Sequence, residues 1–104
     1  MIKFKVVRNS EQKIIKIEVK GHSGYAEHGS DIVCAAVSTA CIMTVNGIEA
    51  QNLADITYVE KDGFLVCDIP EKREEGADLL LNSLMIMIYE IAKQYKKYLF
   101  ILEV

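Results

Sequence analysis

A histidine and a cysteine twelve positions apart are the residues of this sequence best suited to do chemistry. His22 follows Gly21 directly, and Cys34 lies in the apolar run Ile-Val-Cys-Ala-Ala-Val. An imidazole placed beside a thiol is the minimum equipment of a cysteine nucleophile and its base. Each residue also has an ordinary interpretation, because free cysteines are commonly core residues and a loop histidine is often only solvated.

The residues around Cys34 predict that it lies near the start of a helix. Ser30 or Asp31 can cap a helix that runs to about Asn52. Unpaired N–H groups and the positive end of the helix dipole would favour a thiolate in the first turn. Asp31 could also hold the loop or the imidazole in place. Ser38, one turn beyond Cys34 on the same helix face, could contact the site or merely pack.

A metal site is the other chemistry that these residue types allow. It would need His22, His28 and Cys34 to converge, with Asp31 as a further ligand. No Cys-x-x-Cys or His-x-x-x-His spacing supports it, so we expect neither a metal nor an organic cofactor. His28 is a second candidate base or a substrate contact. Cys41 and Cys67 follow apolar periodicities and are predicted to be core residues.

The composition limits the class of protein. The 104 residues suffice for one domain, 1–104, and 51% of them are apolar. The formal net charge is −3 and no Lys/Arg block exceeds two residues, so direct nucleic-acid binding is not expected. The N-terminus alternates like a strand and not like a signal peptide, and the longest apolar stretch, 84–89, is too short to span a bilayer. Three cysteines fit a reducing compartment, so we expect a cytoplasmic protein with no membrane partner.

The hydrophobic periodicities predict an α+β domain with the order β-β-α-β-β-α-β. Period-two alternation predicts strands, and three-to-four-residue periodicity with acidic starts and basic ends predicts helices. Asp62-Gly63 suits a tight hairpin turn, and the glycines between Gly21 and Ser30 indicate a loop. We therefore expect a two-layer fold with two long helices packed on an antiparallel-rich sheet. The expected strands are 2–6, 15–19, 56–60, 64–69 and 99–104, and the expected helices are 30–52 and one that follows Pro70 and ends near Lys97.

One segment is also familiar as a motif. Gly21-His22, a glycine-containing spacer and a run from Gly29 to Ser38 that contains Asp-Ile-Val-Cys resemble the ribosomal-processing cysteine protease family, Prp. The specific part of the resemblance covers residues 21–38, and length and element order fit over the whole chain. The resemblance implies that His22 is the catalytic histidine and Cys34 the nucleophile. Gly21, Asp31 and Ser38 also match positions of the motif.

The same resemblance implies a function. Members are small bacterial cytoplasmic proteases that act as homodimers and remove an N-terminal extension from protein twenty-seven of the large ribosomal subunit. The expected partner is therefore the N-terminal peptide of that precursor. Two other functions stay open from the residues alone. One is a non-catalytic ribosome-associated module that binds a peptide, and the other is a thiol redox sensor that uses Cys34 without His22.

Overall fold

Seven elements follow one another in the predicted order β-β-α-β-β-α-β. A computed structural model describes the backbone of residues 1–21 and 30–104 and the side chains of residues 1–21 and 32–104. All seven predicted strands and helices are present, although most of them begin or end a few residues from the predicted positions. Their bounds are β1 Ile2–Arg8, β2 Ile14–Lys20, α1 Ser30–Ala50, β3 Thr57–Lys61, β4 Phe64–Asp68, α2 Glu75–Gln94 and β5 Leu99–Glu103.

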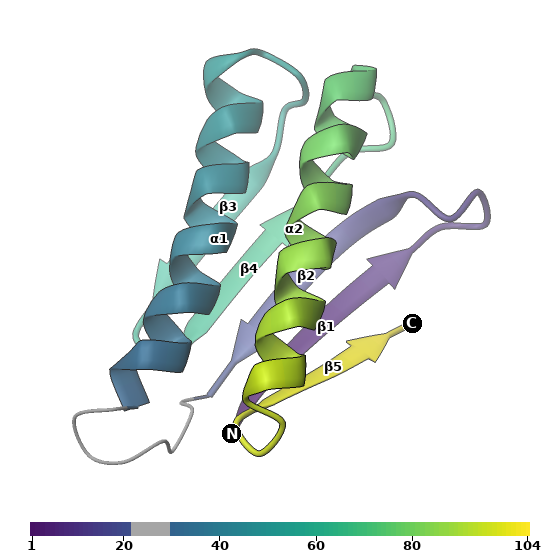
Figure 1. The fold of residues 1–104 in the computed structure, drawn as a ribbon. Helices are drawn as coiled ribbons and strands as arrows, with labels where there is room; N and C mark the ends of the chain where they lie inside the picture. Colours follow the sequence, from purple (N-terminus) through teal and green to yellow (C-terminus); the bar gives the residue numbers. More distant parts are fainter. Residues whose placement is uncertain (22–29) are drawn as a thin grey trace.

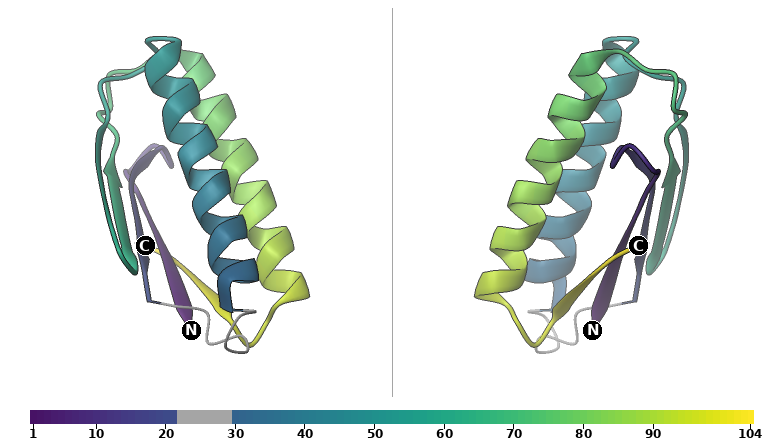
Figure 2. Two further views of the ribbon diagram at one scale, coloured as in Figure 1. Left: turned by 90° about the vertical axis from the view of Figure 1, so that its left-hand side faces the viewer. Right: turned by 90° about the vertical axis from the view of Figure 1, so that its right-hand side faces the viewer.

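The five strands form one sheet in the order β3-β4-β2-β1-β5. The pairs β1–β2, β2–β4 and β3–β4 are antiparallel, and β1–β5 is parallel. Both helices lie side by side on one face of the sheet, and no helix of the described residues lies on the other face (Figures 1 and 2). The predicted α+β fold with two helices on an antiparallel-rich sheet is confirmed.

The core lies between the helices and the sheet. Ile2, Phe4 and Val6 of β1 point into it, as their alternation predicts. In β2 the prediction that Ile15 shares a face with Ile17 is wrong, because Ile14 and Ile17 are the buried pair, each 2% exposed. Val7 of β1 pairs with Lys16 of β2, but the next residue, Arg8, pairs with Ile14, so Ile15 is skipped in the pairing. Because of this β-bulge the simple alternation of faces is shifted by one residue at the start of β2.

The helix α1 is apolar on nearly all sides, and one stripe of it fills the centre of the core. By length and composition alone, residues 32–50 could cross a membrane. The stripe is spaced by three and four residues and packs against the sheet and α2, as in the core helix of a globular domain. Its buried members are Val33, Val37, Cys41, Thr44, Val45 and Ile48.

Gly47 is the place where α1 approaches α2. A Cβ atom built there would lie 3.2 Å from Cδ1 of Leu80 on α2, so a glycine leaves room for that side chain. The helix continues through Gly47 to Ala50. The residue thus serves close packing of the two helices.

Candidate active site

The end of β2 is fastened to the turn of the β3–β4 hairpin. Lys61 and Phe64 form the last pair of that hairpin, which leaves Asp62 and Gly63 as its turn, and Gly63 takes the positive φ of 71°. The N–H of Gly21 donates a hydrogen bond to the carbonyl oxygen of Gly63, at 2.9 Å between nitrogen and oxygen. The residue directly before His22 therefore has a fixed place beside the hairpin turn.

Gly21 occupies a backbone position that other residues rarely take. Its φ is +93°, in the region that favours glycine. A Cβ atom built on it would lie 2.5 Å from the carbonyl oxygen of Met1, closer than real Cβ atoms approach any atom. Position 21 thus requires glycine because the backbone at the end of β2 passes close to the backbone of Met1, directly before β1.

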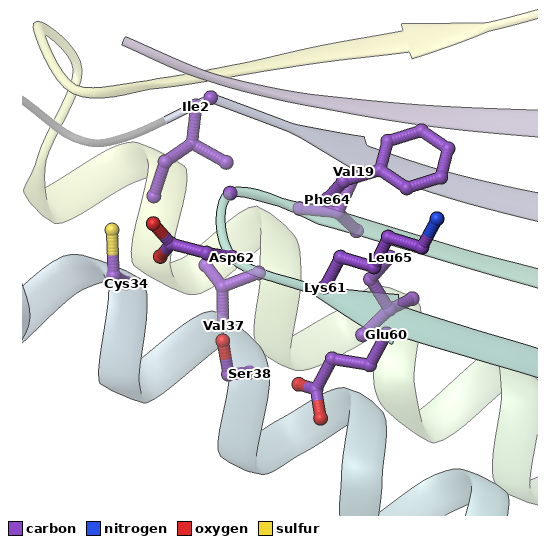
Figure 3. Close-up of a pocket in the computed structure, with 12 residues that line it drawn as sticks. Ile2, Val19, Cys34, Val37, Ser38, Glu60, Lys61, Asp62, Phe64 and Leu65 are labelled. Atoms are coloured by element: carbon purple, nitrogen blue, oxygen red, sulfur yellow. The ribbon is translucent and has the colours of Figure 1, made fainter.

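A pocket of about 530 Å³ opens where α1, the hairpin turn and the ends of β1 and β2 meet (Figure 3). Cys34 and Ser38 come from α1, and the hairpin forms the opposite wall. Apolar side chains from the sheet form the floor. The residues that line it are Ile2, Val19, Gly21, Cys34, Val37, Ser38, Glu60, Lys61, Asp62, Gly63, Phe64 and Leu65.

The three cysteines differ sharply in their surroundings. Cys41 and Cys67 are buried, and only Cys34 is partly exposed. Cys41 and Cys67 are each 2% exposed, and burial raises the pKa of Cys41 to about 12 and that of Cys67 to about 11. The prediction that Cys41 and Cys67 are core residues is confirmed. A thiol that must reach a substrate is therefore Cys34.

The helix α1 begins at Ser30, as predicted, but Cys34 lies just beyond its first turn. Because α1 begins at Ser30, Cys34 is its fifth residue and opens the second turn. The dipole acts most strongly on the first turn, so its effect on this thiol is smaller than expected for a first-turn residue. The first four residues of the helix, 30–33, have no partner for their N–H groups within the helix. These groups lie on the N-terminal side of Cys34.

The structure brings together three of the five residues that the sequence singles out. Gly21, Cys34 and Ser38 line the same pocket. Asp31 is the second residue of α1, and a cap precedes the first helical residue, so the prediction that Asp31 caps the helix is wrong. The side chain of Asp31 lies outside the description. His22 and His28 lie outside the described residues, and so does most of the loop expected between Gly21 and Ser30. Among the residues that the structure describes, no three His, Cys, Asp or Glu side chains are placed to hold a metal ion.

The hairpin wall is the part of the pocket that sequence reasoning missed. Asp62 and Gly63 are recognisable as turn residues, but a turn signal does not say what the turn faces. The wall exists because β4 pairs with β2, which carries the hairpin past α1. That pairing joins residues about fifty positions apart, and no local pattern in the sequence specifies it.

Comparison with known proteins places the chain in a family. Residues 1–100 match the family model for cysteine protease Prp. The ribosomal processing cysteine protease Prp of Bacillus subtilis is 30% identical, with 92% of this chain and 91% of that protein covered. A crystal structure of the ribosomal processing protease Prp from S. aureus, with a covalently linked product peptide, superposes over the full length of both chains with a TM-score of 0.91 and 24% identity. A crystal structure from Streptococcus mutans matches with a TM-score of 0.84 and 27% identity, and the match covers 100% of this chain and 94% of the other. The chain belongs to the cysteine protease Prp family.

Proposed function

We propose that this chain is an endopeptidase that removes the N-terminal extension of protein twenty-seven of the bacterial large ribosomal subunit. Its single domain would span residues 1–104, with Cys34 as nucleophile and His22 as general base. The observation that carries the proposal is the placement of the one partly exposed thiol in a pocket whose wall is hydrogen-bonded to Gly21, the neighbour of His22. The names of the relatives, which are ribosomal processing proteases, support the substrate class.

The chemistry would proceed through a thioester. His22 accepts the proton of Cys34, and the sulfur attacks the carbonyl carbon of the scissile peptide bond. Backbone N–H groups at the start of α1 are suited to stabilise the oxyanion that forms. His22 then protonates the leaving amine as the C–N bond breaks, and water, deprotonated by His22, hydrolyses the thioester and releases the thiol.

The other three motif residues would support this dyad. Gly21 sets the direction in which the chain enters His22, because its positive φ and its hydrogen bond to Gly63 fix the end of β2. Ser38 forms part of the pocket wall beside Cys34 and would contact the peptide. Asp31 would place a negative charge in the first turn of α1, where it stabilises the positive end of the helix dipole.

The direct test is incubation with the precursor of the host's ribosomal protein, with the products identified by mass. The Cys34→Ala variant should fold and cleave at background rate, and Cys34→Ser should be nearly inactive because a hydroxyl is far harder to deprotonate. Cys41→Ala, which removes a buried thiol, is the matched control and should retain cleavage. Full-rate processing by Cys34→Ala would refute the proposal.

Alkylation kinetics distinguish the protease from the two other functions. A protease predicts fast labelling of Cys34 by iodoacetamide that slows when His22 is replaced by alanine. A redox sensor predicts labelling of Cys34 that does not depend on His22. A non-catalytic peptide binder predicts slow labelling. If His28→Ala slowed both labelling and cleavage more than His22→Ala, His28 would be the base.

The oligomeric state and compartment are part of the same proposal. We propose a cytoplasmic homodimer, as the family resemblance implies. Three cysteines, an odd number, suit a reducing compartment. The helix layer also exposes large apolar side chains that a second copy could cover: Met43, Leu79, Ile86 and Met87. Sedimentation equilibrium would give the mass in solution, and a monomer at micromolar concentration would contradict the dimer.

A further inference from the structure

Two carboxylates stand on the hairpin wall of the pocket. Glu60 pairs with Leu65, which is buried, so Glu60 extends from the helix-facing side of β3. Asp62 follows two residues later, in the hairpin turn, and both residues line the pocket. In Figure 3 the Asp62 carboxylate points toward the side of the pocket that holds Cys34, and the Glu60 carboxylate lies farther along α1, past Ser38. The negative charge thus extends from the thiol along the first turns of the helix.

The positive charges nearby do not compensate this pair. Lys61 pairs with Phe64 and belongs to the opposite side of β3, and Figure 3 shows its amino group directed away from Cys34. Lys20 pairs with Phe64 on the same outer side and forms its ion pair with Glu18, at 2.8 Å. Within the described part of the chain, the three ion pairs involve Arg8, Lys20 and Arg73, and none includes Glu60 or Asp62.

The side chain next to Glu60 on the same face does not neutralise it either. The hydroxyl of Tyr58 is buried, and its pKa is raised to about 12, first by burial and then by the negative charge of Glu60. Tyr58 therefore remains neutral at physiological pH and adds no charge to the wall. The two carboxylates outnumber Lys61, the one basic residue among the described residues that line the pocket, and a surface with an excess of negative charge favours cationic ligands.

We propose that this acidic wall, with Asp62 as the main determinant, selects peptide substrates that carry a lysine or arginine close to the scissile bond. The inference rests on the proposed protease function and names the substrate class of the same pocket. Taken as a sphere, 530 Å³ is about 10 Å across. An extended peptide advances about 3.3 Å per residue, so the pocket holds about three residues. The basic side chain should therefore lie within about three residues of the bond that is cut.

The size of the effect follows from the exposure of both carboxylates. Glu60 and Asp62 are exposed in the free protein, so each should contribute like a surface ion pair. We expect up to about fivefold in kcat/KM per carboxylate, and less at high salt. The pair would then give a preference of roughly 2- to 25-fold for a basic over an uncharged side chain of similar length.

The test uses peptides that span the cleavage site found with the ribosomal-protein precursor. At each of three positions on either side of the bond, lysine is compared with norleucine and glutamate. For the wild-type enzyme, the lysine-to-norleucine ratio of kcat/KM should reach roughly 2 to 25 at one position and fall between about 50 mM and about 500 mM salt. In Asp62→Asn with Glu60→Gln the ratio should fall to about 1, and Asp62→Lys should favour the glutamate peptide. Asp68→Asn, an exposed carboxylate on the outer side of the hairpin opposite Lys16, is the matched control and should leave the ratio unchanged.

The same ratio can be measured without cleavage, which separates this inference from the proposed function. Peptide binding to Cys34→Ala, followed by fluorescence anisotropy, should show the lysine preference and its loss in the Asp62→Asn, Glu60→Gln background. A preference in binding with no cleavage of any peptide by the wild-type chain would refute the proposed function and support the acidic wall. Cleavage with equal rates for lysine and norleucine at all six positions would refute the acidic wall and leave the protease standing. A lysine preference that persists in the double variant would also refute it.

Discussion

Replacing Gly21 by alanine tests whether the motif glycine is set by the backbone. The substitution adds one methyl group at a residue with φ of +93°, and the new Cβ would lie 2.5 Å from the carbonyl oxygen of Met1. Neither problem can be relieved by rotating a side chain, because the contact is with backbone. The chain must move at the end of β2 or at the start of β1.

Two costs of known size apply. Left-handed backbone costs a non-glycine residue about 1–2 kcal/mol. Moving the end of β2 to relieve the contact would weaken the hydrogen bond from Gly21 to Gly63, which contributes about 1 kcal/mol net. We therefore expect Gly21→Ala to lower the free energy of unfolding by roughly 2–3 kcal/mol. A domain of this size has about 5–15 kcal/mol in total, so the variant should remain folded at 25 °C.

Urea unfolding followed by circular dichroism measures this change. Gly47→Ala is the matched control, since its Cβ meets only the end of the Leu80 side chain at 3.2 Å and alanine favours the helix. It should stay within about 1 kcal/mol of the wild type. Because Gly21→Ala remains mostly folded, any loss of precursor cleavage beyond the unfolded fraction would report displacement of the residue that follows it. An unchanged unfolding midpoint for Gly21→Ala would refute the backbone argument.

Two further predictions concern the core. Burial raises the pKa of Cys41 from an ordinary value of 9.0 to about 12, so the contribution of this thiol to stability should be constant below about pH 9 and fall by about 1.4 kcal/mol per pH unit between pH 9 and 12. Cys67, whose pKa is raised to about 11, adds a fall of the same sign above about pH 9. Urea titrations at about pH 8 and about pH 10 measure the total fall, which should be smaller in Cys41→Ala. Ile14→Ala should cost about 2–4 kcal/mol and Ile15→Ala clearly less, because the bulge in β2 buries Ile14; equal losses in chemical denaturation would contradict the register.

Much of the fold could be predicted because each element carries its own periodicity. The alternation of Ile2, Phe4 and Val6 defines both β1 and the face that it buries. Asp62-Gly63 marks a hairpin turn because one residue must take a positive φ, and Gly63 does. The apolar character of α1 all round predicts a central helix, and its stripe from Val33 to Ile48 is buried.

The errors and omissions arise where residues distant in sequence decide the outcome. The skipped residue in β2 depends on how that strand pairs with β1, and Ile14 and Ile15 are equally apolar, so the composition cannot say which one is buried. The conformation of Gly21 depends on Met1, twenty residues earlier. The acidic wall depends on the pairing of β4 with β2.

The location of the site follows from these same long-range pairings. A cysteine at the start of a helix is common and by itself does no chemistry. Here β2 ends, the β3–β4 hairpin turns and α1 begins at the same end of the molecule, and the hydrogen bond from Gly21 to Gly63 joins the first two. In the proposed mechanism the local motif, residues 21–38, would supply the reacting groups, and its residues Cys34 and Ser38 form one wall of the pocket. The hairpin supplies the opposite wall, and because it lies outside the motif its charges could vary without altering the proposed dyad. Substrate preference should therefore depend on the hairpin residues Glu60 and Asp62, and the rate of bond cleavage on Cys34 and His22.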